Sequence, residues 1–98
     1  MNMQAMLKQA QAMQRDMLKA KEEIDNTDFN GENGLVKVTM KGDKTITSVV
    51  IDKEGFEVDD LDMLQDMFMV ATNEAMKKVD KLTEEKMGKY TQGMPGLF

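Results

Sequence analysis

The sequence predicts an α+β fold: a helix, a β-hairpin of two to three antiparallel strands and a second helix, in a single domain covering residues 1–98. Two observations predict this order. Apolar residues recur at helical spacing near both ends of the chain, and β-branched residues alternate with other residues in the middle. With 98 residues, the chain is short for burying a large core on its own. We therefore expect a homodimer from which the helices project as arms.

The first predicted helix covers residues 3–25. Its apolar residues repeat every seven positions in two series offset by three, as at the a and d positions of a coiled coil. They are Met3, Met6, Ala10, Met13, Met17, Ala20 and Ile24. A helix of about 34 Å is longer than a six-residue strand of about 20 Å, so the hairpin cannot cover the whole seam. We therefore predict that a second copy covers it, with Met6, Met13, Met17 and Ile24 in the dimer interface.

The middle of the chain, residues 27–52, predicts an antiparallel sheet. The segments LVKVTM and TITSVVID are rich in β-branched residues and alternate in period two. Gly42 and Asp43 lie between them and predict a hairpin turn. A short extra strand near residues 27–30 can pair at the edge of the sheet. The Asn- and Gly-rich stretch that follows the first helix is expected to break it.

The second predicted helix covers residues 60–87. Leu61, Phe68, Ala75 and Leu82 are spaced by seven and form the centre of an apolar stripe. Asp59 or Asp60 is expected to cap the start, and Gly88 to end the helix. Residues 88–98 are expected to form a flexible tail.

Composition argues against enzyme chemistry. The chain has no Cys and no His, so it lacks the commonest general base and the commonest metal ligands. A Cu(I) site made of thioethers has no Cys or His to complete it, and DKEGFEVDDLDM lacks the glycine position and final Glu of a calcium loop. We expect no catalytic residues, metal, cofactor or small-molecule substrate. The sequence has no apolar run long enough for a membrane span and no secretory signal, which favours a cytoplasmic protein.

The net charge of -5 alone argues against a nucleic-acid partner, but the charge is unevenly distributed. Residues 22–36 and 54–66 hold eleven acidic residues and no basic ones, whereas residues 1–21 hold four basic residues and one acidic one. Helical spacing brings Lys8, Arg15 and Lys19 onto one outward face of the first helix. A second basic cluster, Lys77, Lys78 and Lys81, lies on the second helix. A solvated surface and a binding face both account for these charges.

Several segments resemble the YbaB/EbfC family of bacterial nucleoid-associated proteins. They are MLKQAQAMQRDM, GLVKVTMKG, SVVID, DDLDMLQDMFMVATNEAMKKV and a Gly-Met-Pro tail ending in Phe98. The resemblance covers nearly the whole chain in order, although the turn NGENGL is shorter than the family's glycine-rich loop. It implies a homodimer of α+β protomers that binds double-stranded DNA with little or modest sequence preference. It also implies a nucleoid location and a role in nucleoid organisation and gene regulation.

The resemblance and the charge pattern together assign a role to the basic residues. The residues expected to contact DNA phosphates are Lys8, Arg15, Lys19, Lys77, Lys78 and Lys81. Gln4, Gln11 and Gln14 are candidates for reaching base edges. The alternative is a prefoldin-like holdase that grips proteins without binding DNA, because Met-rich surfaces suit promiscuous binding.

Overall fold

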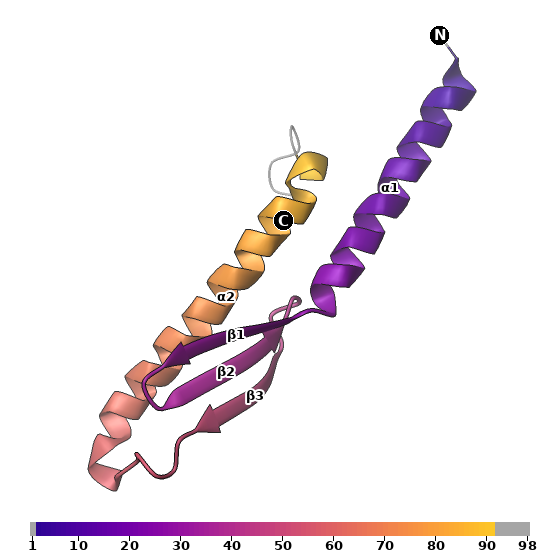
Figure 1. Cartoon of the computed structure of the whole chain (residues 1–98). Helices are drawn as coiled ribbons and strands as arrows, with labels where there is room; N and C mark the ends of the chain where they lie inside the picture. Colours follow the sequence, from indigo (N-terminus) through magenta and orange to yellow (C-terminus); the bar gives the residue numbers. More distant parts are fainter. Residues whose placement is uncertain (1, 92–98) are drawn as a thin grey trace.

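The structure is a computed structural model that describes residues 2–91. The elements are α1 (Met3–Asp25), β1 (Asp28–Asn33), β2 (Val36–Lys41), β3 (Ile46–Ile51), a short 3-10 helix η1 (Val58–Asp60) and α2 (Leu61–Thr91). The strands form one antiparallel sheet in the order β1-β2-β3. Helix α2 packs against the sheet, and α1 extends away from it (Figure 1). The predicted α+β fold class is confirmed, with three strands in the sheet.

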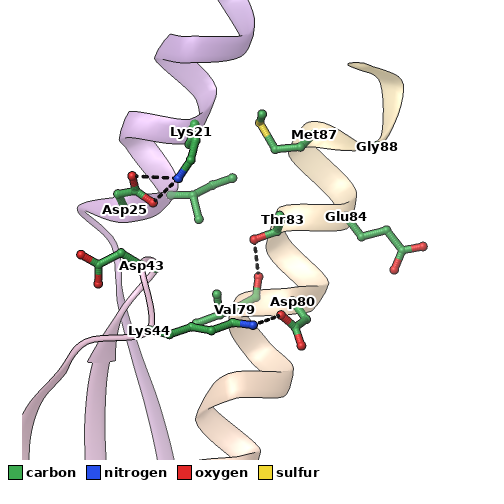
Figure 2. Close-up of a pocket in the computed structure, with 12 residues that line it drawn as sticks. Lys21, Asp25, Asp43, Lys44, Val79, Asp80, Thr83, Glu84, Met87 and Gly88 are labelled. Atoms are coloured by element: carbon green, nitrogen blue, oxygen red, sulfur yellow. Dashed lines mark hydrogen bonds and ion pairs between the residues drawn. The ribbon is translucent and has the colours of Figure 1, made fainter. Parts of the chain in front are cut away.

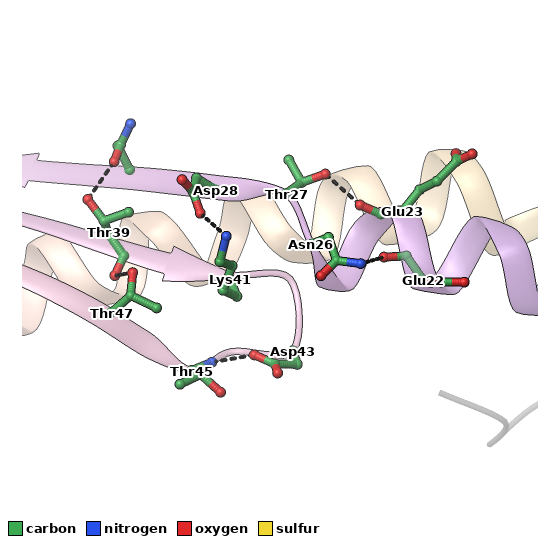
Figure 3. Close-up of polar contacts among 11 residues, drawn as sticks. Glu22, Glu23, Asn26, Thr27, Asp28, Thr39, Lys41, Asp43, Thr45 and Thr47 are labelled. Carbon is green, nitrogen blue, oxygen red and sulfur yellow. Dashed lines mark hydrogen bonds and ion pairs between the residues drawn. The ribbon is translucent and has the colours of Figure 1, made fainter.

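Polar side chains define both ends of α1. Asn2 is the N-cap, since its Oδ1 accepts the backbone N–H groups of Gln4 and Ala5 at 3.1 and 3.3 Å. At the other end, the Asn26 amide and the Thr27 hydroxyl donate to carbonyl oxygens of the last turn at 3.0 and 2.6 Å (Figure 3). The Glu22 carbonyl also accepts the backbone N–H of Asn26 at 3.1 Å, and these bonds together cap the C-terminal end of α1 where the chain turns into β1.

Strand β1 is longer than the strand near residues 27–30 that the sequence suggests. It runs from Asp28 to Asn33 and includes Gly31, which belongs to the stretch predicted to break the first helix. Gly31 is buried because the backbone of α2 lies directly against it. Tertiary packing therefore overrides the low strand propensity of the segment DFNGEN. The turn into β2 contains Gly34 at φ +53°, a conformation that favours glycine.

Two features hold the turn between β2 and β3. The backbone N–H of Thr45 donates to the Asp43 Oδ1 at 2.9 Å (Figure 3). Hydrogen bonds from the Thr45 side chain and backbone lower the pKa of Asp43 from its usual value. Gly42 lies so close to the carbonyl of Ile24 that a side chain there would overlap it. The turn is therefore packed directly against the last turn of α1.

The core lies between α2 and the first two strands. Val36, Val38 and Met40 on the inner face of β2 are fully buried, which confirms the predicted alternation. They pack with α2, whose Ala71 and Ala75 let the helix backbone approach the sheet closely. The β3 residues that pair with this inner face are exposed, because α2 does not cover β3.

Helix α2 differs from the prediction at both ends. Its start is preceded by η1, in which the Asp60 carboxylate accepts the Glu57 backbone N–H at 3.2 Å, so Asp60 closes a 3-10 turn and does not cap α2. At the other end, α2 continues through Gly88 to Thr91, beyond the predicted end at residue 87. Glycine costs a helix interior only about 1 kcal/mol, which is not enough to end a helix of 31 residues. Residues 88–91 are therefore helical, and the rest of the predicted tail lies outside the described residues.

Candidate nucleic-acid interface

Three basic side chains form a stripe along α1. Lys8, Arg15 and Lys19, the basic stripe, are all exposed. At 3.6 residues per turn they share one side of the helix, opposite the side that carries Met3, Met6 and Met13. The stripe spans about 16 Å along the helix axis. It thus forms a line of positive charge that faces away from the apolar seam.

Some basic side chains of the described chain form ion pairs with acidic side chains, and others do not. Six lysines form ion pairs with acidic side chains, at 2.8 to 3.8 Å: Lys21, Lys37, Lys41, Lys44, Lys78 and Lys86. Between residues 2 and 91, no such ion pair involves Lys8, Arg15, Lys19, Lys77 or Lys81. Five of the six predicted DNA-contacting residues therefore remain available to an external anion.

Lys78 is the exception among the six predicted residues. Its Nζ donates to the backbone carbonyl of Asn30 in β1 at 2.7 Å and lies 3.4 Å from the Glu74 carboxylate. Its position on α2 is closer to the core-facing side than those of Lys77 and Lys81, which explains why it reaches the sheet. The structure therefore gives Lys78 contacts within the chain, to β1 and to Glu74, with which a DNA phosphate would have to compete.

A pair of neutralising substitutions tests this difference. Lys78→Gln is expected to lower the free energy of unfolding by about 1 kcal/mol, since it removes a hydrogen bond and a half-exposed ion pair. It should leave DNA affinity close to wild type. Lys77→Gln makes the same change of charge on the neighbouring residue and should weaken DNA binding without altering stability. Urea unfolding and fluorescence anisotropy of both variants measure the two effects, and the opposite pattern would contradict the assignment.

The four predicted interface residues have different environments in the single chain. Ile24 is only 3% exposed and packs beside the β2–β3 turn, so within the single chain it belongs to the protomer core. Met17 is half-buried. Met6 and Met13 are 53% and 54% exposed. The N-terminal part of α1 extends past the end of α2 (Figure 1). The seam is therefore partly filled within the protomer and is open towards the N-terminus.

A cleft of about 560 Å³ lies between α1, α2 and the β2–β3 turn (Figure 2). Its rim carries the ion pairs of Lys21 with Asp25 and of Lys44 with Asp80. Asp43 and Glu84 add further negative charge. The four acidic residues outnumber the two lysines, and both lysines are already paired. This cleft is therefore poorly suited to binding a phosphate backbone.

An exposed apolar area, which sequence reasoning missed, lies at the sheet end of the molecule. The residues concerned are Ile46, Val49 and Ile51 on the inner face of β3, and Leu61 and Phe68, which are exposed near the start of α2; we call this set the open-core surface. Val49 and Ile51 pair with Val38 and Val36 across the ladder, so they extend the inner face of the sheet beyond the edge of α2. Phe68 lies one turn before the buried Ala71. The consecutive apolar residues Val49, Val50 and Ile51 were the sequence signal, because a solvated edge strand rarely carries them.

Acidic and basic residues are concentrated at different places along the long axis of the molecule, which measures 71 Å. The acidic segment 54–66 forms the loop after β3, η1 and the start of α2, at the opposite end from the N-terminal half of α1 (Figure 1). Electrostatic screening at physiological salt acts over about 8 Å. The basic stripe can therefore attract an anion despite the negative net charge of the chain.

The described part of the chain offers no obvious centre for other chemistry. Within residues 2–91, no three His, Cys, Asp or Glu side chains are placed to hold a metal ion. None of the helices described is both long and apolar enough to cross a membrane.

Fold and charge together define a class: a small α+β protein with a long helical arm that carries a basic stripe on one face. The chain belongs to the YbaB/EbfC DNA-binding family, whose model matches residues 1–94. This is a family of DNA-binding proteins and not of enzymes.

The chain is similar over nearly its whole length to known proteins. The chain is 46% identical over 98 residues to a nucleoid-associated protein of Enterococcus faecalis, and the match covers 98% of this chain and 94% of that protein. It is 48% identical over 101 residues to one of Exiguobacterium sibiricum, covering 99% and 95%. The crystal structure of the uncharacterized protein HP0035 from Helicobacter pylori has the same fold, with a TM-score of 0.69, 21% identity and coverage of 98% and 99%.

Proposed function

We propose that the chain is a nucleoid-associated protein that binds double-stranded DNA as a homodimer. The observation that carries this proposal is the basic stripe, which is exposed, free of ion pairs in the described chain and located on a helix that extends away from the acidic end. The family description and the names of the relatives support DNA as the partner and the nucleoid, in the cytoplasm, as the location.

The stripe is suited to contacts with phosphates. Double-stranded DNA carries one negative charge for about every 1.7 Å of its axis, so a line of three cations over about 16 Å can follow the backbone. Such contacts position a protein and carry no sequence information. Lys77 and Lys81 add positive charge on α2, but they span only about one turn, whereas the α1 stripe spans about three. The α1 stripe is therefore proposed as the main DNA contact, and little sequence preference follows. Binding at many sites would let the protein organise the nucleoid and influence gene expression.

Sequence preference gives a direct test. A random duplex, an A·T-rich duplex and a G·C-rich duplex should bind with dissociation constants within about fivefold of one another, because phosphate contacts do not distinguish bases. A single good base contact would by itself discriminate by about 1 to 3 kcal/mol and would produce a larger difference. Competition against one labelled duplex measures all three under the same conditions. A preference of a hundredfold or more for one duplex would show that base contacts dominate.

The homodimer is proposed to form through the open-core surface. The inner face of β3 is a continuation of the core that no element of the described chain covers. A second copy, placed by a two-fold axis, would bury this surface against its own equivalent. It would also add the large apolar contact that a chain of 98 residues needs.

Val49→Lys tests the interface. Val49 is 43% exposed in the protomer, so a lysine there can reach water in the monomer, but in the dimer it would place a charge in an apolar contact. We expect light scattering to report monomers where the wild type is a dimer. Ser48→Lys is the matched control, since Ser48 is its neighbour on the opposite face of β3 and should leave the dimer intact. A dimeric Val49→Lys protein would contradict the interface.

A further inference from the structure

The N-terminal part of α1 is an apolar helix face that nothing in the described chain covers. Met3 is 81% exposed, and Met6, Leu7 and Met13 are each more than half exposed. We call Met3, Met6, Ala10 and Met13 the arm seam. It continues, in the same heptad, the line of residues that becomes buried further along α1 at Ile24. The seam thus has coiled-coil spacing but lacks a partner helix beyond the end of α2 (Figure 1).

The arm is also unusually neutral for an exposed helix. Between residues 2 and 14, Lys8 is the only charged side chain. The positions that flank the seam carry Asn2, Leu7, Gln9 and Gln14. In coiled coils, like charges at the flanking positions repel each other and so prevent unwanted pairing. The flanking positions here are uncharged, so two such helices can approach each other without this repulsion. A neutral surface with regularly spaced apolar residues favours contact with its own copy.

The basic stripe lies on the side of the arm opposite the seam, and this decides whether pairing through the seam would block DNA binding. Lys8 and Arg15 lie on the far side of the helix from Met6 and Met13. A second helix packed on the seam therefore leaves the basic stripe accessible. The arm seam is also separate from the open-core surface, because the residues of that surface lie on β3 and on the first turns of α2 and not on α1 (Figure 1). One chain therefore has two apolar surfaces at different positions along its length.

We propose that the arm seam binds the arm seam of another dimer, so that two DNA-bound dimers join two duplexes. The proposal depends on the DNA binding proposed above. An arm segment of residues 3–13 is about 16 Å long, shorter than a helix needs for stable pairing alone. The contact is therefore weak between single dimers. It becomes effective when several dimers are held close together on DNA, because each further contact is then intramolecular.

A bridging assay tests the proposal. One duplex is fixed to beads, and capture of a second, fluorescent duplex is measured at protein concentrations that give equal occupancy of a single duplex. Met6→Gln/Met13→Gln should reduce capture by about tenfold or more, since the seam loses its large apolar side chains. Single-duplex affinity should stay unchanged. Ala5→Gln/Ala12→Gln introduces the same two glutamines away from the seam, without removing an apolar side chain from it, and should bridge like wild type. Met6→Leu/Met13→Leu should retain bridging.

The other outcomes are distinct. Normal bridging by Met6→Gln/Met13→Gln would overturn the proposal, as would a wild type that binds single duplexes and never bridges. If the variant is monomeric by light scattering, the seam is the main dimer interface, which also overturns the proposal. A chain truncated after Thr91 tests residues 92–98 as an alternative occupant. If the truncated chain binds single duplexes as the wild type does but bridges at least tenfold more, the tail covers the seam in the intact protein. Absence of single-duplex binding by every variant would instead refute the proposed function.

Discussion

Gly31→Ala is expected to destabilise the chain by about 3 kcal/mol or more, a large part of the 5 to 15 kcal/mol typical of small domains. A Cβ at this position would overlap the carbonyl oxygen of Ala71 and lie 2.8 Å from the backbone nitrogen of Ala75. Both neighbours are backbone atoms of α2, so no side chain can rotate away. Helix and strand would have to separate, and this opens the core around Phe29 and Val38. Urea unfolding followed by circular dichroism measures the change.

Gly88→Ala is the matched control, because it makes the same substitution with the opposite expected effect. Gly88 lies inside α2, and a Cβ there would meet nothing within 4 Å. Alanine stabilises an unobstructed helix position by about 0.5 to 1 kcal/mol relative to glycine. A Gly31→Ala protein as stable as wild type would contradict the close packing of β1 against α2.

Arg15→Glu/Lys19→Glu is expected to weaken binding to duplex DNA by about 100-fold or more at low salt. The two substitutions remove four cations per dimer and put four anions in their place. The slope of log K against log salt concentration should become shallower by about 3 to 4, because four phosphate contacts are lost. Folding and dimerisation should be nearly unchanged, since both residues are exposed and outside the open-core surface.

Lys37→Glu/Lys53→Glu is the matched control, because it changes the net charge by the same amount at positions outside the basic stripe. It therefore shows whether DNA affinity depends on where the charge lies or only on the net charge. Lys37 lies on the sheet and Lys53 in the loop after β3, outside the basic stripe. If position decides binding, this control should lose far less affinity than Arg15→Glu/Lys19→Glu. Equal losses in the two proteins would show that only the net charge matters, and the assignment of the α1 stripe would fail.

Local sequence patterns were sufficient to predict most of the fold. The heptad repeat of α1, the alternation in β2 and the apolar stripe of α2 each have one strong period, and each forms the expected element. Strand β1 was predicted only in part, because its strand conformation depends on Gly31 packing against a helix some 40 residues later in the chain. Residues 88–91 are helical for a related reason: the end of a helix depends on the neighbouring turns as well as on one glycine.

The site was predictable where it depends on helix geometry and unpredictable where it depends on tertiary contacts. The basic stripe follows from the spacing of Lys8, Arg15 and Lys19 alone. The contact of Lys78 with Asn30 and the burial of Ile24 depend on how α2 and the β2–β3 turn are placed. The open-core surface likewise becomes visible only when α2 is seen to leave β3 uncovered.

A salt titration of binding to a random duplex tests the central claim most directly. Anisotropy would be measured on protein confirmed as a dimer. Six phosphate contacts per dimer, three from each basic stripe, predict a slope of log K against log salt of about -5. Absence of binding at about 50 mM salt, where such contacts are strong, or a slope near zero would contradict the claim. Either result would favour the protein-binding alternative, for which suppression of client aggregation would be the assay.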